Sequence, residues 1–92
     1  MRRRDRFDRG KLPSAKDYYR SQGLRFRGRG EWQSTLCPFH DDHTPSLRVS
    51  LATGGYRCMA CGVRGGDVLD FHMRRYNTSF VAAAKQMGAW RD

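Results

Sequence analysis

The chain has 92 residues and a net charge of +9, from 18 lysine and arginine residues against 9 acidic ones. This length favours a single domain. Hydrophobic residues make up 38% of the chain, which allows only a modest core that a bound metal would stabilise. No apolar run approaches the roughly 18 residues of a membrane-spanning helix, and no signal-peptide core follows the basic start. We therefore expect a cytoplasmic location, where cysteines serve as metal ligands rather than in disulfides.

The positive charge is concentrated near the start of the chain. Residues 1–30 carry 11 basic and 3 acidic residues, whereas residues 31–92 carry 7 basic and 6 acidic ones. Most of the basic residues are arginines, whose planar guanidinium suits phosphate and stacks on bases. This pattern favours a nucleic acid as partner over an acidic lipid surface. We expect residues 1–12 to form a disordered basic arm ahead of a domain over residues 13–92.

The elements expected along the chain are those of a small α+β domain. Ser14 precedes a short helix over residues 15–22, which Gly23 ends. Short strands follow over residues 24–27, 31–36, 46–51 and 56–58, with turns between them. One helix then runs from residue 66 or 67 to 75, and another from 79 or 80 to 87. The expected fold is an antiparallel sheet of about three to five short strands, with a short N-terminal helix and two C-terminal helices.

Three cysteines and one histidine form two pairs with the spacing of a zinc site. Two residues separate Cys37 from His40, 17 residues follow, and two residues separate Cys58 from Cys61. Each pair lies on a turn, and the strand, turn and returning strand between them bring the two turns together. Four nitrogen and sulfur ligands match a closed tetrahedral zinc site, and three thiolates disfavour Mg²⁺ and Ca²⁺. His43 is the alternative to His40, at a longer spacing.

Two segments around this pattern carry a family resemblance. They are CPFHDDHTPSLRV, from residue 37, and GYRCMACGVRGGDVLDF, from residue 55. They resemble the Cys-His-Cys-Cys zinc-binding domain of bacterial and phage DNA primases, and the resemblance covers about residues 13–88. It implies a zinc ribbon of antiparallel strands with helices beside it, which binds single-stranded template and helps to select the initiation site. In such primases a separate Toprim-type domain joins ribonucleotides with clustered carboxylates and divalent metal.

The resemblance does not extend to the catalytic domain, because the sequence up to Asp92 contains no carboxylate cluster for two-metal chemistry. We therefore expect this chain to bind single-stranded DNA and to assist a separate catalytic primase, polymerase or helicase partner. It is either part of a larger primase or a stand-alone protein acting in trans, and its complete-looking start and helical end favour the second. The alternatives are a protein-interaction adaptor and a duplex-reading regulator of a replication or mobile-element system.

Alternation along the expected strands predicts where a nucleic acid binds. Apolar residues at every second position point inward, so the arginines between them point outward. This outer face can follow a phosphate backbone, with arginines of the turns extending it and two aromatic rings stacking on unpaired bases. The predicted interface consists of Arg25, Arg27, Arg29, Trp32, Arg48, Tyr56, Arg57 and Arg64. Packing in the core is the alternative for both rings and is favoured for Tyr56.

Overall fold

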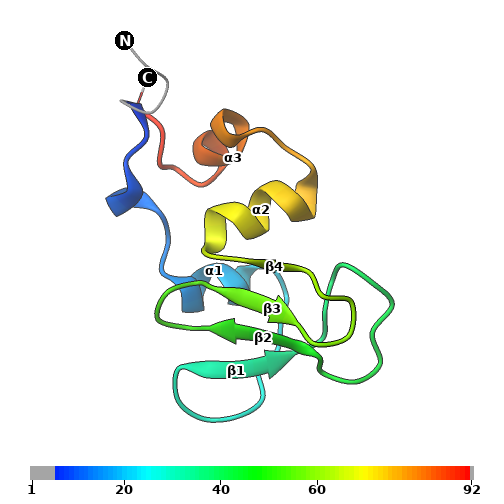
Figure 1. Cartoon of the computed structure of the whole chain (residues 1–92). Helices are drawn as coiled ribbons and strands as arrows, with labels where there is room; N and C mark the ends of the chain where they lie inside the picture. The colour runs from blue at the N-terminus through cyan, green and yellow to red at the C-terminus, as the bar shows by residue number, and fades with distance from the viewer. Residues whose placement is uncertain (1–5, 92) are drawn as a thin grey trace.

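The computed structural model describes residues 6–91, which form one four-stranded sheet, three α-helices and a short 3₁₀ helix (Figure 1). Their bounds are Arg9–Lys11 for the 3₁₀ helix, Ala15–Ser21 for α1, Trp32–Thr35 for β1, Leu47–Ser50 for β2, Tyr56–Cys58 for β3, Arg64–Gly65 for β4, Val68–Tyr76 for α2 and Phe80–Gln86 for α3. The strands pair antiparallel in the order β1-β2-β3-β4. This is the small α+β architecture that the sequence predicts, with β4 as an added strand.

Each α-helix begins at a polar residue that its sequence pattern provides. The side chains of Ser14, Asp67 and Ser79 accept hydrogen bonds from the backbone N–H three residues further on. Gly23 and Gly88, with φ of +78° and +75°, follow the ends of α1 and α3. All three predicted helices are confirmed, with bounds that differ by at most two residues. In the part of the chain that the structure describes, no helix is long and apolar enough to span a membrane.

The core lies between one face of the sheet and helices α1 and α2. Leu47 and Val49 of β2 are fully buried on this inner face. Phe71 of α2 lies at the centre of an aromatic cluster, with ring centroids 5.0–5.9 Å from those of Tyr18, Tyr19, Phe39 and Tyr56. Edge-to-face packing of this kind adds to the burial of the rings. The cluster fixes both helices against the sheet and anchors the turn that contains Phe39.

Two glycines allow α2 to approach the sheet closely. Gly54 has a φ of +84°, and a Cβ there would lie 3.0 Å from the backbone nitrogen of Val68. Gly65 of β4 lies opposite Tyr56, and a Cβ there would overlap the Tyr56 hydroxyl. That hydroxyl donates a hydrogen bond of 2.5 Å to Asp70 of α2. The end of the sheet is therefore held directly against this helix.

Residues 24–27 do not form the strand that their alternating pattern predicts. Only Arg27 pairs, with Ser34 of β1, through backbone N–H···O bonds of 2.7 and 2.8 Å. Because β1 ends at Thr35, where the chain turns toward Cys37, residue 25 has no strand residue opposite it. Leu24 and Phe26 still pack against the core, as the alternation predicts.

Residues 6–8 of the expected basic arm lie against the C-terminal segment, so this part of the arm packs on the domain. Phe7 pairs with Trp90 in an isolated bridge, and its ring meets that of Phe80 edge-on at 5.0 Å. Backbone N–H···O bonds of 2.8 and 2.7 Å join residues 8 and 89 and residues 6 and 91. The arm is rich in arginine and aspartate, and Phe7 is the residue that supplies its apolar contact, so its composition does not predict this packing. Residues 1–5 of the arm lie outside the described residues, and the domain boundary after residue 12 stays a prediction.

Candidate functional site

The four predicted metal ligands meet at one end of the sheet. Cys37 and His40 lie in the turn after β1, and Cys58 and Cys61 lie at the end of β3 and in the turn that follows. Strand pairing causes this convergence, because Thr35 lies opposite Leu47 and Leu47 opposite Cys58. One donor atom from each of the four ligands lies within 4.8 Å of all the others. Across residues 6–91, this is the only such group of three or more His, Cys, Asp or Glu residues.

Two of the distances between the donor atoms are close to the edges of a tetrahedral zinc site. The sulfurs of Cys37 and Cys61 are 4.0 Å apart, and Nε2 of His40 is 3.4 Å from the sulfur of Cys58. With Zn–S of about 2.3 Å and Zn–N of about 2.0 Å, the corresponding tetrahedral edges are about 3.8 and 3.5 Å. The alternative ligand His43 lies 3.5 Å from Asp41 instead, with its side chain 84% exposed. Cys37, His40, Cys58 and Cys61 are thus positioned to bind one zinc ion.

Asp42 holds the first ligand turn in place. Its Oδ2 accepts hydrogen bonds of 2.8 Å from both the backbone N–H of Cys37 and the hydroxyl of Ser46. The Cys37 N–H is the main cause that lowers the pKa of Asp42. Its Oδ1 lies 3.9 Å from Nε2 of His40. Sequence reasoning missed this supporting role, although the position of Asp42 between Cys37 and Ser46 in the CPFHDDHTPS segment was a signal for it.

The two buried cysteines differ in how readily they lose a proton. Burial raises the pKa of Cys58, but the backbone N–H of Cys61 and the hydroxyl of Ser46, among other donors, outweigh burial and lower it to about 6. Burial raises the pKa of Cys37 to about 12. Zinc binds thiolates, so binding of the metal at Cys37 requires release of the thiol proton to solvent.

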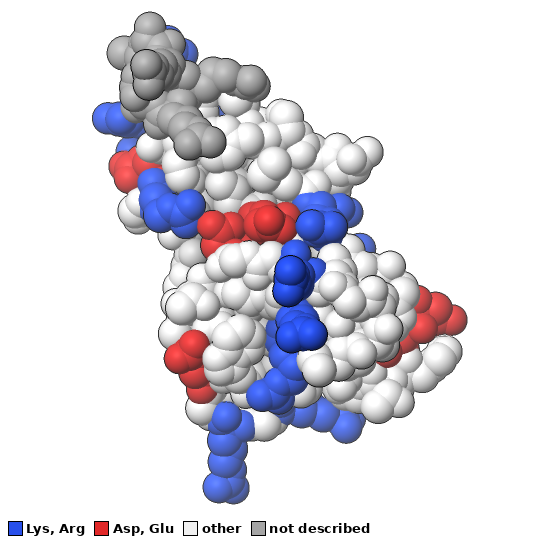
Figure 2. Space-filling model, viewed as in Figure 1, with Lys and Arg blue, Asp and Glu red and all other residues white. Residues whose placement is uncertain are grey.

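The outer face of the sheet carries a row of arginines that runs across the strands. Arg48 of β2 lies opposite Arg57 of β3, which lies opposite Arg64 of β4. On the other side of Arg48, Ser34 of β1 lies opposite it and pairs in turn with Arg27. Directly opposed residues of antiparallel strands share a face, so Arg27, Arg48, Arg57 and Arg64 form one arginine row. Figure 2 shows a continuous line of basic side chains across the sheet.

The charge of the arginine row is not neutralised within the described residues. Arg48 donates to the hydroxyl of Ser34 at 2.9 Å and to the backbone oxygen of Trp32 at 3.4 Å. No side-chain hydrogen bond or ion pair joins the other three arginines to any residue in the range 6–91. The nearby carboxylates of α2 and its cap pair elsewhere, with Arg9 and Arg74. The row therefore presents unpaired positive charge to solvent.

The two aromatic residues of the predicted interface lie on opposite faces. Trp32 alternates with Ser34 along β1, so it shares the face of the arginine row, and it is 44% exposed. Tyr56 points into the core and is 2% exposed, with its ring stacked on that of Phe39 at 6.1 Å. The prediction that Tyr56 stacks on a base is wrong, because its ring is buried and its hydroxyl is bonded to Asp70.

Two further arginines of the predicted interface lie outside the arginine row. Arg25 was expected to share the sheet face, but it lies beyond the end of β1 and at the rim of a cavity on the inner side. Arg29 is exposed in the bend between Gly28 and Gly30, which have positive φ. Its place beside the row stays a prediction.

Comparison with known proteins agrees with the geometry of the metal centre. The family model described as the CHC2 zinc finger matches residues 20–91 of this chain. The chain belongs to the CHC2 zinc-finger family. All four predicted zinc ligands fall within the matched residues. We refer to this chain below as the CHC2 domain.

Relatives of the CHC2 domain include phage and bacterial proteins. The gene 58 protein of Mycobacterium phage D29 is 47% identical over 55 residues, which are 60% of this chain and 42% of that protein. The DNA primase of Clostridium acetobutylicum is 40% identical over 67 residues, which are 73% of this chain and 11% of the primase. The CHC2 domain thus spans less than half of the phage protein and about a tenth of the primase.

A solved structure shares the fold of the CHC2 domain. The crystal structure of the zinc-binding and RNA polymerase domains of the Aquifex aeolicus primase matches it with a TM-score of 0.67 and 33% sequence identity. The match covers 87% of this chain and 20% of that chain. The expected fold and zinc cofactor are therefore confirmed by family, by structure and by the arrangement of the ligands.

Proposed function

We propose that the CHC2 domain is a primase-type zinc module that binds single-stranded DNA template and assists a separate catalytic partner in starting primer synthesis. The observation that carries this proposal is the arginine row with the exposed Trp32 on the same face. A line of unpaired cations can follow the phosphates of one strand, and an exposed indole offers a stacking surface to an unpaired base.

Single-stranded DNA fits the charged surface better than duplex does. A duplex-reading domain commonly places a helix with free polar side chains in the major groove. The basic residues of α2 lie in its last turn, where Arg74 donates to the Tyr56 hydroxyl at 3.2 Å and lies 3.9 Å from Asp70. The outer face of the sheet instead brings unpaired arginines and the exposed indole of Trp32 together.

The polymerising chemistry would come from another domain or protein. The solved relative joins zinc-binding and RNA polymerase domains in one crystal structure, and the present chain matches 20% of it. The CHC2 domain would hold the template while its partner joins the nucleotides.

Fluorescence anisotropy with labelled DNA tests the binding step. The zinc-loaded chain should bind a single strand more tightly than a duplex of the same sequence, with an affinity that falls as salt rises. Replacing Arg57 and Arg64 with alanine should weaken single-strand binding and reduce the salt slope by about 0.7 units for each phosphate that is no longer bound. The control variant, Arg75→Ala with Lys85→Ala, removes the same charge from exposed positions outside both the row and the N-terminal arm. Equal binding by the two double variants would refute a DNA-binding role for the row.

A primer-synthesis assay tests the assisting role separately. A primase fragment that contains the catalytic domain but lacks its own zinc domain should make more primer when the CHC2 domain is added. The Arg57→Ala, Arg64→Ala variant should stimulate less. Tight DNA binding without stimulation would leave the module a DNA-binding domain and exclude the assisting role.

A second candidate function is a protein-interaction adaptor, and two exposed apolar residues beside the metal centre favour it. Leu36, directly before Cys37, is 47% exposed, and Met59, directly after Cys58, is 66% exposed. Exposed apolar residues that form one patch mark interaction surfaces, and each of these two residues adjoins a zinc ligand in the sequence. If replacing both with serine abolishes stimulation while DNA binding is retained, this end of the domain contacts the partner.

A further inference from the structure

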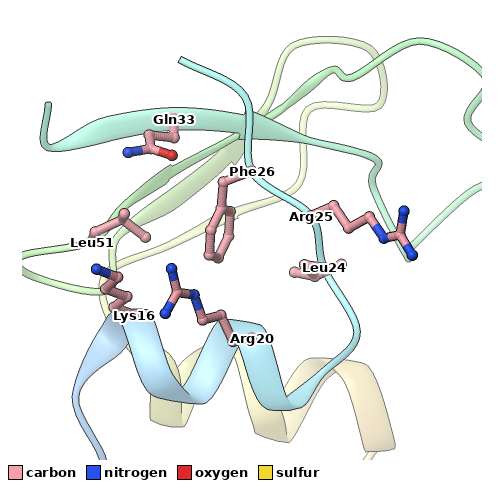
Figure 3. A pocket seen from close by; sticks show the side chains of 7 residues that line it. All are labelled: Lys16, Arg20, Leu24, Arg25, Phe26, Gln33 and Leu51. Carbon is pink, nitrogen blue, oxygen red and sulfur yellow. The ribbon is translucent and has the colours of Figure 1, made fainter. Parts of the chain in front are cut away.

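A cavity of about 350 Å³ lies between α1 and the inner side of β1, away from the arginine row (Figure 3). Small-molecule sites commonly have volumes of about 300–1,000 Å³. Its wall on one side is α1, and on the other it is residues 24–26 with Gln33 of β1. Nothing in the zinc centre or the proposed DNA face uses these residues.

Two cations of α1 reach toward this cavity. Lys16 and Arg20 are four residues apart, so they lie on the same side of the helix. Figure 3 shows Arg20 extending from α1 toward Phe26, and Lys16 extending toward Leu51. Arg25 adds a third charge at the rim, with its guanidinium directed away from the cavity (Figure 3). None of the three has an ion pair or a side-chain hydrogen bond within residues 6–91, and no acidic residue lines the cavity. Like charges at this spacing destabilise a helix, and a bound anion would remove the repulsion.

The rest of the lining suits a planar, partly apolar group. The half-buried ring of Phe26 projects into the cavity, between Leu51 and Leu24 (Figure 3). Gln33 supplies one amide at the wall, and its Nε2 donates to the carbonyl of Gly30 at 3.2 Å. The amide oxygen of Gln33 accepts no hydrogen bond from the described residues, so it can accept one from a ligand.

We propose that this cavity binds one nucleotide, with its phosphate at Lys16 and Arg20 and its base against Phe26. The free oxygen of Gln33 can accept a hydrogen bond from the amino group of adenine or cytosine or from the N3–H of uracil or thymine, so it orients the base without selecting one. A free nucleotide and one unit of a single strand offer this same chemistry. The inference goes beyond the proposed function and does not depend on it, because it concerns other residues on another side of β1.

Nuclear magnetic resonance titration of the zinc-loaded full chain tests the site with adenosine monophosphate, uridine monophosphate and inorganic phosphate. These ligands compete weakly for zinc, so the metal centre stays intact. Adenosine monophosphate should shift the amide signals of Lys16, Arg20, Phe26 and Gln33 more than those of Arg48 and Arg57. Adenosine monophosphate and uridine monophosphate should both bind more tightly than inorganic phosphate, because the base adds its contact with Phe26.

Variants assign the binding to the proposed residues. Replacing Lys16 and Arg20 with alanine keeps a good helix former in α1 and should lower the affinity for adenosine monophosphate by about tenfold or more. The control pair Lys11→Ala and Lys85→Ala should leave that affinity unchanged. Gln33→Ala should weaken the binding of both nucleotides and leave that of inorganic phosphate unchanged.

The outcomes separate the possible sources and the failures. If only a short single-stranded oligonucleotide shifts the cavity signals, the occupant is a unit of the strand, and if the monophosphate does so too, the site takes a free nucleotide. Equal binding of phosphate and nucleotide, equal affinity of the two double variants, or no shift at the cavity with either ligand would overturn the proposal. Loss of DNA binding by the Arg57→Ala, Arg64→Ala variant tests the arginine row, and retained nucleotide binding by that same variant would support a separate site in the cavity.

Discussion

Arg48 and Arg57 lie directly opposite each other on β2 and β3, although like charges in this position destabilise an antiparallel sheet. Arg48 is partly compensated by its bond of 2.9 Å to Ser34. Arg57 is exposed, pairs with nothing within residues 6–91, and faces a second arginine, Arg64, on its other side. Repulsion within the row is therefore greatest at Arg57.

Replacing Arg57 with threonine should stabilise the fold and weaken DNA binding together. Threonine suits a strand, and relief of the opposed charges should raise the free energy of unfolding by about 0.2–1 kcal/mol at low salt. Thermal melts at about 0.02 M and about 1 M salt should show the gain shrinking as salt screens the repulsion. Arg57→Lys keeps the charge and should give no such gain. A melting temperature for Arg57→Thr that is unchanged at low salt would contradict the argument.

Loss of one zinc ligand should unfold the domain, because the metal joins turns that no disulfide connects. The purified chain should contain one zinc ion, and Cys58→Ser and His40→Ala should lose most of it together with strand and helix content. His43→Ala is the matched control, since His43 lies outside the ligand group and should keep both. Elemental analysis and far-ultraviolet circular dichroism measure the two quantities. A folded, metal-free Cys58→Ser protein would disprove the structural role of zinc.

The neighbouring pair Asp41 and Asp42 should differ sharply on substitution. Asp42→Ala removes the acceptor for the N–H of Cys37 and the hydroxyl of Ser46. Losing such a supporting bond lowers metal affinity by about 10–100-fold. Asp41 is 92% exposed, so Asp41→Ala should have little effect. Competition with a zinc chelator measures both affinities, and equal values would show that Asp42 does not support the site.

What the sequence predicts well in this chain is local. The two-residue spacing within each ligand pair fixes a turn, and the caps Ser14 and Ser79 lie beside the helices that they start. The alternation of Leu47 and Val49 with Arg48 follows from strand geometry alone, so the inner and outer faces can be assigned before any partner strand is known.

What the sequence does not predict depends on partners that are distant along the chain. Residues 24–27 alternate like a strand, but the length of β1 decides how many of them pair. Phe7 is held by Trp90, which lies at the other end of the chain. Tyr56 lies next to Arg57 on β3, and its sequence position does not show what its hydroxyl contacts. Only the position of α2 shows that this hydroxyl donates a hydrogen bond to Asp70.

Trp32 and Tyr56 should respond to substitution in opposite ways. Trp32→Ala should leave the melting temperature nearly unchanged and cost about 1–3 kcal/mol of single-strand binding if the ring stacks a base. Tyr56→Phe removes the bond of 2.5 Å to Asp70 and should destabilise the fold by about 1–2 kcal/mol without affecting DNA affinity. In a Trp90→Phe background, DNA should also quench the fluorescence of Trp32. Destabilisation by Trp32→Ala at full DNA affinity would make the indole a packing residue.

The basic N-terminal residues should increase the affinity for single-stranded DNA without favouring any DNA sequence. The packing of Phe7 determines how many of these residues can be deleted without disturbing the fold. Deleting residues 2–5 removes three arginines and one aspartate, whereas a longer deletion would also remove the packing of Phe7 on Trp90 and Phe80.

The short deletion should weaken binding to all single-stranded sequences alike and flatten the salt dependence by about 0.7 units for each phosphate that the arginines no longer neutralise. The melting temperature should not change. Phe7→Ala should do the reverse, lowering stability by about 1–2 kcal/mol, less than for a fully buried ring, at an unchanged salt slope. Anisotropy titrations over several salt concentrations and thermal melts separate the two variants. An altered sequence preference after the short deletion would show that these arginines contact bases rather than phosphates.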